Sequence, residues 1–343
     1  MRRYTGEALH ENAKVAILAN DALGNFSICT PLAQTFRRDC PNGIVDYYGG
    51  ERTRELEEAL VGDLFDFRSS ILGVPLSEAA GLGLARTQEV GGYDLVVNIE
   101  VGPAHKAFAV MLGSEYVCGP SLDISSRGDW EYPSDERGDL WRDQAWAAPD
   151  LTSKYPFLES PFIGEIFHRL AYRTGSLPPY RFHQETPEMD IPEVLISTGA
   201  SLTNKLWPVQ KWHEFLSSLD APAGLLGAPP KRQAEFYHSG DAEQALVDER
   251  LVVDLRGKLT LPQVVGALAR ARAVVTIDNG ILHFAAANDV STVGLYRKEI
   301  ARLWAPPNPN LAVVTPDSGS VDQITVEAVT LAFNSLSKDA PLP

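Results

Sequence analysis

Residues 274–286 read VVTIDNGILHFAA, and this stretch gives the clearest indication of the fold class of the chain. An apolar, β-branched run reaches Asp278, Asn279 and Gly280, and a helix-like segment begins at once. Similar strand-to-helix passages occur on both sides of this stretch. Such βαβ alternation predicts parallel sheets covered by helices.

The alternation runs through most of the chain and restarts once, after a stretch rich in proline and polar residues near position 185. The strand-like and helix-like segments before the restart are 14–19, 27–38, 43–48, 52–61, 93–99, 105–112 and 163–173. Those after it are 193–197, 208–219, 223–226, 251–254, 261–270, 273–277, 280–288, 292–296 and 321–336. For 343 residues, two α/β domains are expected. They are an N-terminal domain over 1–180 and a C-terminal domain over 190–320, followed by a terminal helix within 321–343 that can pack back on the N-terminal domain.

Composition excludes several classes of protein. The chain has 30 lysines and arginines against 45 aspartates and glutamates, which argues against nucleic-acid and anionic-membrane partners. No apolar run is long enough for a transmembrane helix, and the N-terminus lacks the apolar stretch of a signal peptide. The three cysteines are too few for a disulfide framework and lack metal-ligand spacing, so a cytoplasmic protein without a metal site is expected.

The acidic excess is uneven. Residues 1–190 hold 17 basic and 29 acidic side chains, whereas residues 191–343 hold 13 and 16. The second half of the chain is therefore the better place for an anionic ligand.

The first candidate site is the turn Asp278-Asn279-Gly280. A helix that starts at the carboxyl end of a parallel strand presents unpaired N–H groups and a positive dipole to an anion. His283, one turn into this helix, can face the same anion. In the alternative interpretation, Asp278 only caps the helix and His283 packs inside it.

The second candidate site lies in STGASLTNKLWPVQKW, residues 197–212. A strand ends at Ser197, and small or hydroxyl residues lead to Lys205 just before a helix. Backbone N–H groups in such a loop can surround phosphate oxygens, to which a lysine adds a compact positive charge. The alternative is an ordinary loop with a solvated lysine, and no Walker A motif is present.

The third candidate site lies in LANDALGNFSICTP, residues 18–31. It has the same strand–loop–helix pattern in the first domain, with Asp21, Gly24 and Asn25 at the carboxyl edge of the sheet. Asp21 can act as a general base if its side chain faces a ligand. The alternative is that Asp21 is a loop or cap residue.

These three loops, with DLRGKLTL (254–261) and VGLY (293–296), resemble glycosyltransferase family 9, the heptosyltransferase-like enzymes. The family shows an LGD…TP segment, a small-residue loop with K.W, and a D[ST]G..H.A segment before V.LY. The resemblance implies a GT-B fold, in which two Rossmann-like domains with parallel sheets face a central cleft. It also implies metal-independent, inverting transfer of a sugar from a nucleotide-sugar such as ADP-heptose, with the donor as a substrate and no further cofactor.

The resemblance also assigns residues to the nucleotide-sugar site of the C-terminal domain. Lys205 matches the lysine that contacts the donor phosphates, beside the loop residues Ser197, Thr198 and Gly199. Asp278, Asn279 and Gly280 match the turn that holds the pyrophosphate, and His283 matches the histidine that follows it.

Asn25 departs from the family, whose members carry aspartate there as the proposed catalytic base. An amide cannot accept a proton at neutral pH, so another carboxylate takes that role, or the acceptor needs little help from a base, or the protein is inactive. We rank Asp21 first, and Glu100 and His105 are the alternatives. A catalytically inactive sugar-nucleotide-binding protein and a sugar-nucleotide epimerase are the other functions that these motifs allow.

The acceptor is expected to be small or soluble, because the N-terminal domain is strongly acidic. Residues 119–160 read as a long loop on the acceptor side, more mobile than either sheet, that carries Trp130, Trp141 and Trp146. Carboxylates and aromatic rings suit a neutral or cationic polyol, such as an aminosugar natural product. In the alternative interpretation, the tryptophans pack into the core and the acidic side chains are simply solvated.

Overall fold

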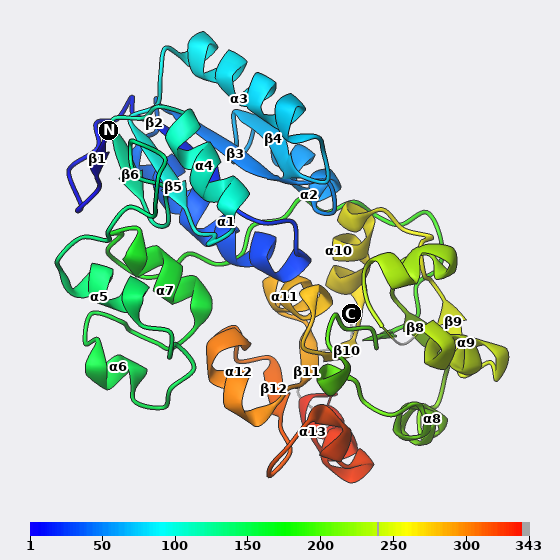
Figure 1. Cartoon of the computed structure of the whole chain (residues 1–343). Helices are drawn as coiled ribbons and strands as arrows, with labels where there is room; N and C mark the ends of the chain where they lie inside the picture. Colours follow the sequence, from blue (N-terminus) through cyan, green and yellow to red (C-terminus); the bar gives the residue numbers. More distant parts are fainter. Residues whose placement is uncertain (239, 338–343) are drawn as a thin grey trace. The chain divides into compact units, whose positions relative to one another are not determined.

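The chain divides into two compact units, Met1–Arg181 and Phe182–Pro343. The computed structural model describes residues 1–238 and 240–337. Each unit is built on one six-stranded sheet in which all neighbouring strands run parallel (Figure 1). The predicted α/β architecture with two parallel sheets is confirmed. In the part of the chain described, no helix has both the length and the apolar character needed to cross a membrane.

The first sheet has the strand order β1-β6-β5-β2-β3-β4. Its strands are Arg2–Arg3 (β1), Lys14–Leu18 (β2), Ile44–Gly50 (β3), Phe67–Leu72 (β4), Leu95–Asn98 (β5) and Tyr116–Cys118 (β6). The helices of this unit are Leu23–Asp39 (α1), Arg54–Glu58 (α2), Leu76–Val90 (α3), Pro103–Met111 (α4), Glu136–Arg142 (α5), Leu151–Lys154 (α6) and Ile163–Leu170 (α7).

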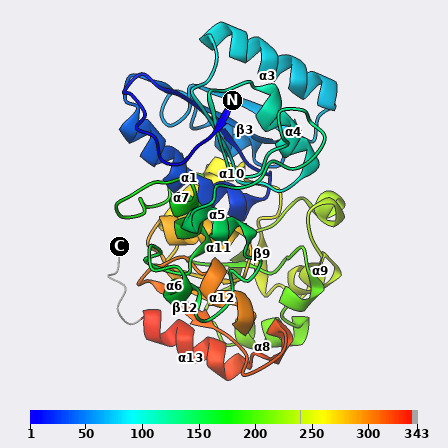
Figure 2. The same cartoon turned by 60° about the vertical axis from the view of Figure 1, so that its left-hand side comes forward.

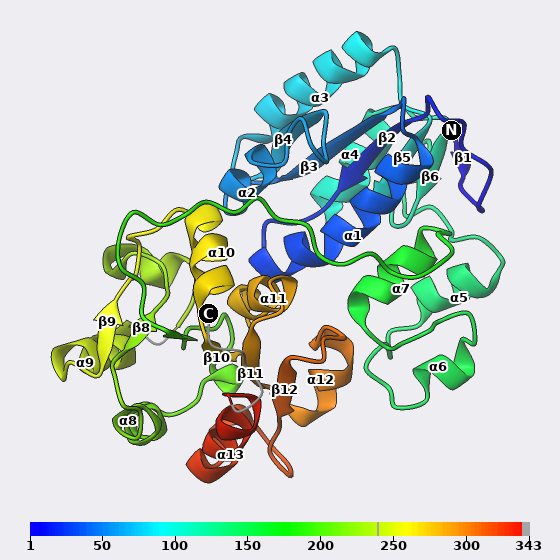
Figure 3. The same cartoon turned by 180° about the vertical axis from the view of Figure 1, so that it is seen from behind.

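Helices cover both faces of this sheet. Successive side chains of a strand point to opposite faces, and β3 shows this directly. Tyr47 packs against Phe26 of α1, while Tyr48 packs against Phe108 of α4. Helix α3 lies beside α4, and α7 lies beside α1 (Figures 1 and 3). The sheet is therefore buried on both faces, and only its edges remain for ligands.

The second sheet has the strand order β12-β11-β10-β7-β8-β9. Its strands are Val194–Ser197 (β7), Ala223–Leu225 (β8), Val252–Asp254 (β9), Ala273–Ile277 (β10), Ser291–Leu295 (β11) and Leu311–Val314 (β12). The helices of this unit are Thr203–Lys205 (η1), Val209–Ser217 (α8), Pro230–Glu235 (η2), Gly240–Asp248 (α9), Leu261–Arg270 (α10), Gly280–Ala287 (α11), Lys298–Trp304 (α12), Val321–Gln323 (η3) and Val326–Ser337 (α13).

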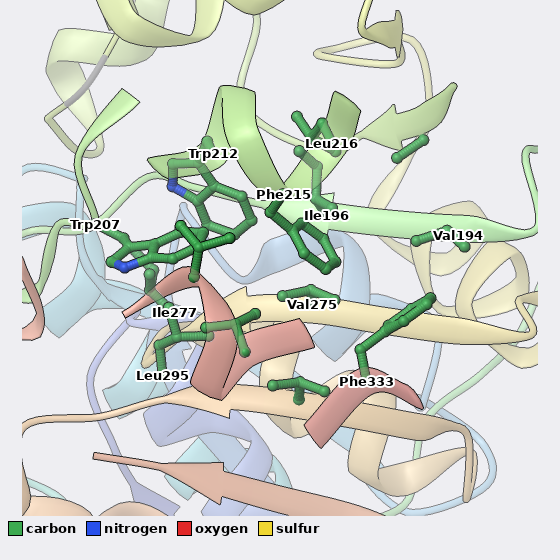
Figure 4. Packing of buried hydrophobic residues seen from close by; sticks show 14 of the residues in the cluster. Val194, Ile196, Trp207, Trp212, Phe215, Leu216, Val275, Ile277, Leu295 and Phe333 are labelled. Carbon is green, nitrogen blue, oxygen red and sulfur yellow. The ribbon is translucent and has the colours of Figure 1, made fainter. Parts of the chain in front are cut away.

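The core of the second unit lies between the strands and helices α8 and α13. Figure 4 shows Trp207, Trp212 and Phe215 packed over the central strands. The rings of Trp207 and Trp212 meet edge to face at 4.9 Å between their centroids. Aromatic packing of this kind fixes how α8, and the loop before it, leave the sheet.

The terminal helix α13, drawn in red in Figure 2, belongs to this same core. Val329 and Phe333 are buried in it, and the Phe333 ring meets Phe215 at 5.6 Å (Figure 4). The apolar face of α13 is buried in the second unit, to which the helix belongs, and its packing back on the N-terminal domain stays a prediction. Residues 338–343 of the expected terminal segment lie outside the described residues.

Residues 119–160 are not one irregular loop, because α5 and α6 lie within them. Trp141 is buried, and Trp146 donates its indole N–H to a backbone carbonyl of α5 at 2.8 Å. Trp130 lies 4.5 Å from the guanidinium of Arg3. The tryptophans therefore pack within the first unit, as in the alternative interpretation, and give this polar segment a small core of its own.

Candidate functional site

The candidate donor site lies where the strand order of the second sheet reverses. From β7 the chain proceeds to β8 and β9 on one side, and then to β10, β11 and β12 on the other. The loops that follow β7 and β10 therefore diverge at the carboxyl edge of the sheet. Such a switch point is where ligands bind in open α/β sheets. The loop after β7 holds residues 198–205, and Asp278-Asn279-Gly280 follows β10.

Lys205 and Asp278 join these two loops. The Nζ of Lys205 lies 2.7 Å from Oδ2 of Asp278, and the side chains are 18% and 6% exposed. The Asp278 oxygen forms this close charge contact without the alignment of a hydrogen bond. A lysine held in this way is a compact positive charge that can turn toward a phosphate.

Asn279 caps helix α11 and ties the site together. Its Oδ1 accepts a hydrogen bond from the backbone N–H of Ile281 at 3.0 Å. Its Nδ2 donates to Oγ of Ser197 and to the carbonyl of Gly199, each at 3.0 Å. The N-terminus of α11 lies at the carboxyl edge of the sheet, where the helix dipole favours an anion.

The loop after β7 is backed by a buried polar cluster that the motifs did not reveal. Thr198 donates to Oε1 of Glu243 at 2.8 Å, and Gln233 donates to the other oxygen of that carboxylate. A Cβ on Gly199 would lie 2.2 Å from the ring of Tyr237, so only glycine fits there. Glu243 is a single carboxylate on a helix distant in sequence, and no spacing rule connects it with the loop.

His283 is buried, 2% exposed, inside α11. Burial lowers its pKa to about 4, against the opposing charge of Asp278 and with a smaller contribution from the charge of Lys205. The imidazole is therefore neutral near pH 7. His283 is therefore packed inside the helix, as in the alternative interpretation, and adds no positive charge to the anion site.

In the first unit, the corresponding switch point lies between β2 and β5. Helix α1 begins at Leu23, so Asn25 is in its first turn and not in the loop. Asn20, after β2, donates its Nδ2 to Oε1 of Glu100, after β5, at 2.7 Å. The Asn25 side chain also hydrogen-bonds this carboxylate. Two amides from different elements thus meet one half-buried glutamate.

Asp21 is on the other side of β2. A Cβ on Gly50, at the end of β3, would lie 2.5 Å from the Cβ of Asp21 and 3.0 Å from its carboxylate. The Asp21 side chain therefore lies against the end of β3. His105, in α4, is buried, and its Nε2 lies 3.1 Å from the carbonyl of Ala19. Burial lowers the pKa of His105.

Part of the sequence matches a known protein family, and the fold of almost the whole chain matches solved structures. Residues 171–327 match the family model of glycosyltransferase family 9 (heptosyltransferase). No curated protein sequence is similar enough to the chain to match it.

Three solved structures share the fold over almost the entire chain. A glycosyl transferase family 9 protein from Veillonella parvula superposes with a TM-score of 0.70 at 14% identity, covering 97% of this chain and 99% of that one. ADP-heptose lps heptosyltransferase II from E. coli gives 0.67 at 19%, covering 95% and 98%. The E. coli heptosyltransferase WaaC with ADP gives 0.60 at 16%, covering 94% and 99%.

These matches agree with the motifs and with the strand orders. The expected GT-B class, in the sense of two parallel α/β units, is confirmed by the sheets and by the structures that share them. The resemblance found in the sequence is likewise confirmed, since residues 171–327 match the model of glycosyltransferase family 9 (heptosyltransferase).

Proposed function

We propose that this chain is an inverting glycosyltransferase that takes a sugar from a nucleoside-diphosphate sugar and passes it to a hydroxyl group. The observation that carries the proposal is the pair of loops at the switch point of the second sheet, joined by Lys205 and Asp278. A lysine and a helix N-terminus at one edge form an anion site suited to a diphosphate.

In the proposed reaction, Lys205 and the positive end of the α11 dipole bind the donor diphosphate. Negative charge develops on the diphosphate as the bond to the anomeric carbon breaks, and these groups stabilise it. Ser197, Thr198 and Gly199 form the adjoining loop, and Asn279 holds that loop to the helix. Asp278 orients Lys205, and Gly280 starts the helix.

We propose an ADP-sugar, and ADP-heptose in particular, as the donor. Support comes from the family match over residues 171–327 and from two heptosyltransferases of the same fold, one named for ADP-heptose and one solved with ADP. The proposed acceptor is a soluble polyol or aminosugar. The excess of acidic side chains in residues 1–190 favours a neutral or cationic compound over an anionic lipid.

We further propose that transfer needs no metal ion, since Lys205 and the helix dipole supply positive charge where the leaving diphosphate forms. Retention of full activity after dialysis against EDTA would support this proposal, and activity restored only by added metal would contradict it.

The test uses the whole chain. Titration calorimetry with ADP, and with UDP as the matched control, measures nucleotide binding, and ADP is expected to bind more tightly. Incubation with ADP-heptose and a panel of soluble aminosugars should release ADP and yield a glycosylated product by mass spectrometry. Nucleotide binding without ADP release or product would identify an inactive binding protein, and an altered sugar on the donor would identify an epimerase.

A further inference from the structure

We propose that Glu100 is the general base of the proposed transfer, and that Asn20 and Asn25 are the residues that position it. This assignment rests on the proposed function and names the group that takes the acceptor proton. It replaces Asp21, which ranked first on sequence, with Glu100, whose carboxylate lies at the switch point of the first sheet.

Glu100 is held by three elements. Asn20 follows β2, and Asn25 lies in the first turn of α1. Both side chains hydrogen-bond the Glu100 carboxylate. Asn98, the last residue of β5, fixes the backbone of Glu100 by accepting from its N–H and donating to its carbonyl, both at 2.9 Å. The carboxylate is therefore oriented from both sides of the point where the strand order reverses.

The partners of Glu100 are neutral, which distinguishes it from the structural glutamate nearby. Glu57 is fully buried, but it forms an ion pair with Arg68 and a hydrogen bond with Thr53. Among the described residues, no lysine, arginine or histidine forms an ion pair with Glu100. Burial raises the pKa of Glu100, and the two amides offset only part of this shift. A carboxylate with a raised pKa is a stronger base for a hydroxyl proton than an ordinary one.

The two alternatives are less suited to the role. The Asp21 side chain lies against Gly50 on the β3 side of β2, outside the switch point. The Nε2 of His105 donates to the Ala19 carbonyl at 3.1 Å, so only its Nδ1 is left to accept a proton, and burial lowers the pKa of this imidazole and makes it a weaker base. Glu100 is the carboxylate that the fold places at the switch point with its orientation fixed.

The acceptor oxygen forms a bond to the anomeric carbon of the donor, and its hydroxyl proton passes to the Glu100 carboxylate. The bond between the anomeric carbon and the diphosphate oxygen breaks, and the electron pair leaves with the nucleoside diphosphate. Water can replace the acceptor in the same step, which gives free sugar and the same nucleoside diphosphate.

The test compares isosteric variants in the full chain. Glu100→Gln should lower the rate of ADP release from ADP-heptose about 10²–10⁴-fold, the usual contribution of a general base. Its affinity for ADP should stay within about threefold of the parent, since the donor residues belong to the other unit. Glu115→Gln is the matched control, because Glu115 precedes β6 at the opposite edge of the same sheet and forms an exposed ion pair with Arg2.

A second variant guards against a merely structural effect. Because the Asn25 side chain touches the Glu100 carboxylate, Asn25→Asp combined with Glu100→Gln exchanges carboxylate and amide between neighbouring positions. This double variant should recover at least about tenfold of the rate lost in Glu100→Gln. A loss shared with Glu115→Gln, or a double variant no faster than Glu100→Gln, would overturn the assignment.

The failure of this assignment differs from the failure of the proposed function. Parent protein that releases ADP, with Glu100→Gln equally active and Asp21→Asn inactive, would make Asp21 the base and leave the proposed function standing. Parent protein that binds ADP but releases none from ADP-heptose with any acceptor would overturn both.

Discussion

Removing the charge of Lys205 and removing the charge of Asp278, in separate variants, should change nucleotide affinity in opposite directions. The pair is close, 2.7 Å, and little water reaches it, since the side chains are 18% and 6% exposed. If the lysine binds the diphosphate, Lys205→Met removes a charge-assisted hydrogen bond and weakens ADP binding by about 1.5–3 kcal/mol. That is roughly a 10–150-fold rise in Kd.

Asp278→Asn should have the opposite sign. The aspartate competes with the diphosphate for Lys205, so removing its charge should strengthen ADP binding by about 1 kcal/mol, roughly fivefold. Calorimetry with ADP, which carries no sugar, keeps any contact with the sugar out of the measurement.

The matched control for this experiment is another pair that joins the same two strands. Arg272 and Glu193 immediately precede β10 and β7, and their side chains pair at 3.2 Å at the amino edge of the sheet. Arg272→Met should leave the ADP affinity within about twofold of the parent, since an exposed pair contributes little. An equal loss of affinity in Lys205→Met and Asp278→Asn, or no loss in Lys205→Met, would refute the assignment of the diphosphate to this edge.

Three further outcomes follow from single side chains. Asn279→Ala removes the cap of α11 and should lower the free energy of unfolding by about 1 kcal/mol while weakening ADP binding, which thermal melts with and without ADP would show. Trp141→Ala should cost about 3–5 kcal/mol of stability but leave ADP affinity as it is, because Trp141 packs in the first unit. Burial lowers the pKa of His168 in the folded chain to about 4. Between pH 6.5 and 4 the unfolded chain therefore binds one more proton than the folded chain, and the free energy of unfolding should fall by about 1.4 kcal/mol for each unit by which the pH is lowered. Urea melts across this range should show a shallower decline in His168→Gln, and an identical slope would contradict the assignment.

Local signals in the sequence predicted the central elements well. Strand β10 (Ala273–Ile277) and helix α10 (Leu261–Arg270) have the predicted bounds. A strand buried on both faces reads as a continuous apolar run, and the capping box of Thr260 with Gln263 marks the start of α10. The two loops of the candidate donor site could be predicted because their small residues and lysine follow such strands directly.

Contacts between distant segments could not be predicted in the same way. Asp21 ranked first as the base because its loop is short, but its orientation depends on Gly50 of a neighbouring strand. Glu100 acquires its environment from two asparagines about 80 positions away. The packing of Trp141 likewise depends on aromatic residues outside its own helix, so the polar composition of residues 119–160 suggested a loop.

The pairing of β7 with β10 has a consequence for how the protein reaches its native state. Thr276 donates a hydrogen bond to the carbonyl of Ser197, 79 positions earlier in the sequence, because two strands, β8 and β9, are completed between them. Closing so long a loop lowers the conformational entropy of the chain before the contacts that offset this loss have formed. Parallel strand pairs of this separation therefore form late. During synthesis the chain must therefore emerge past α11 before the proposed nucleotide site is complete. A nucleotide that binds only the finished unit then stabilises that unit by mass action, by about 2.7 kcal/mol at a hundred times its Kd.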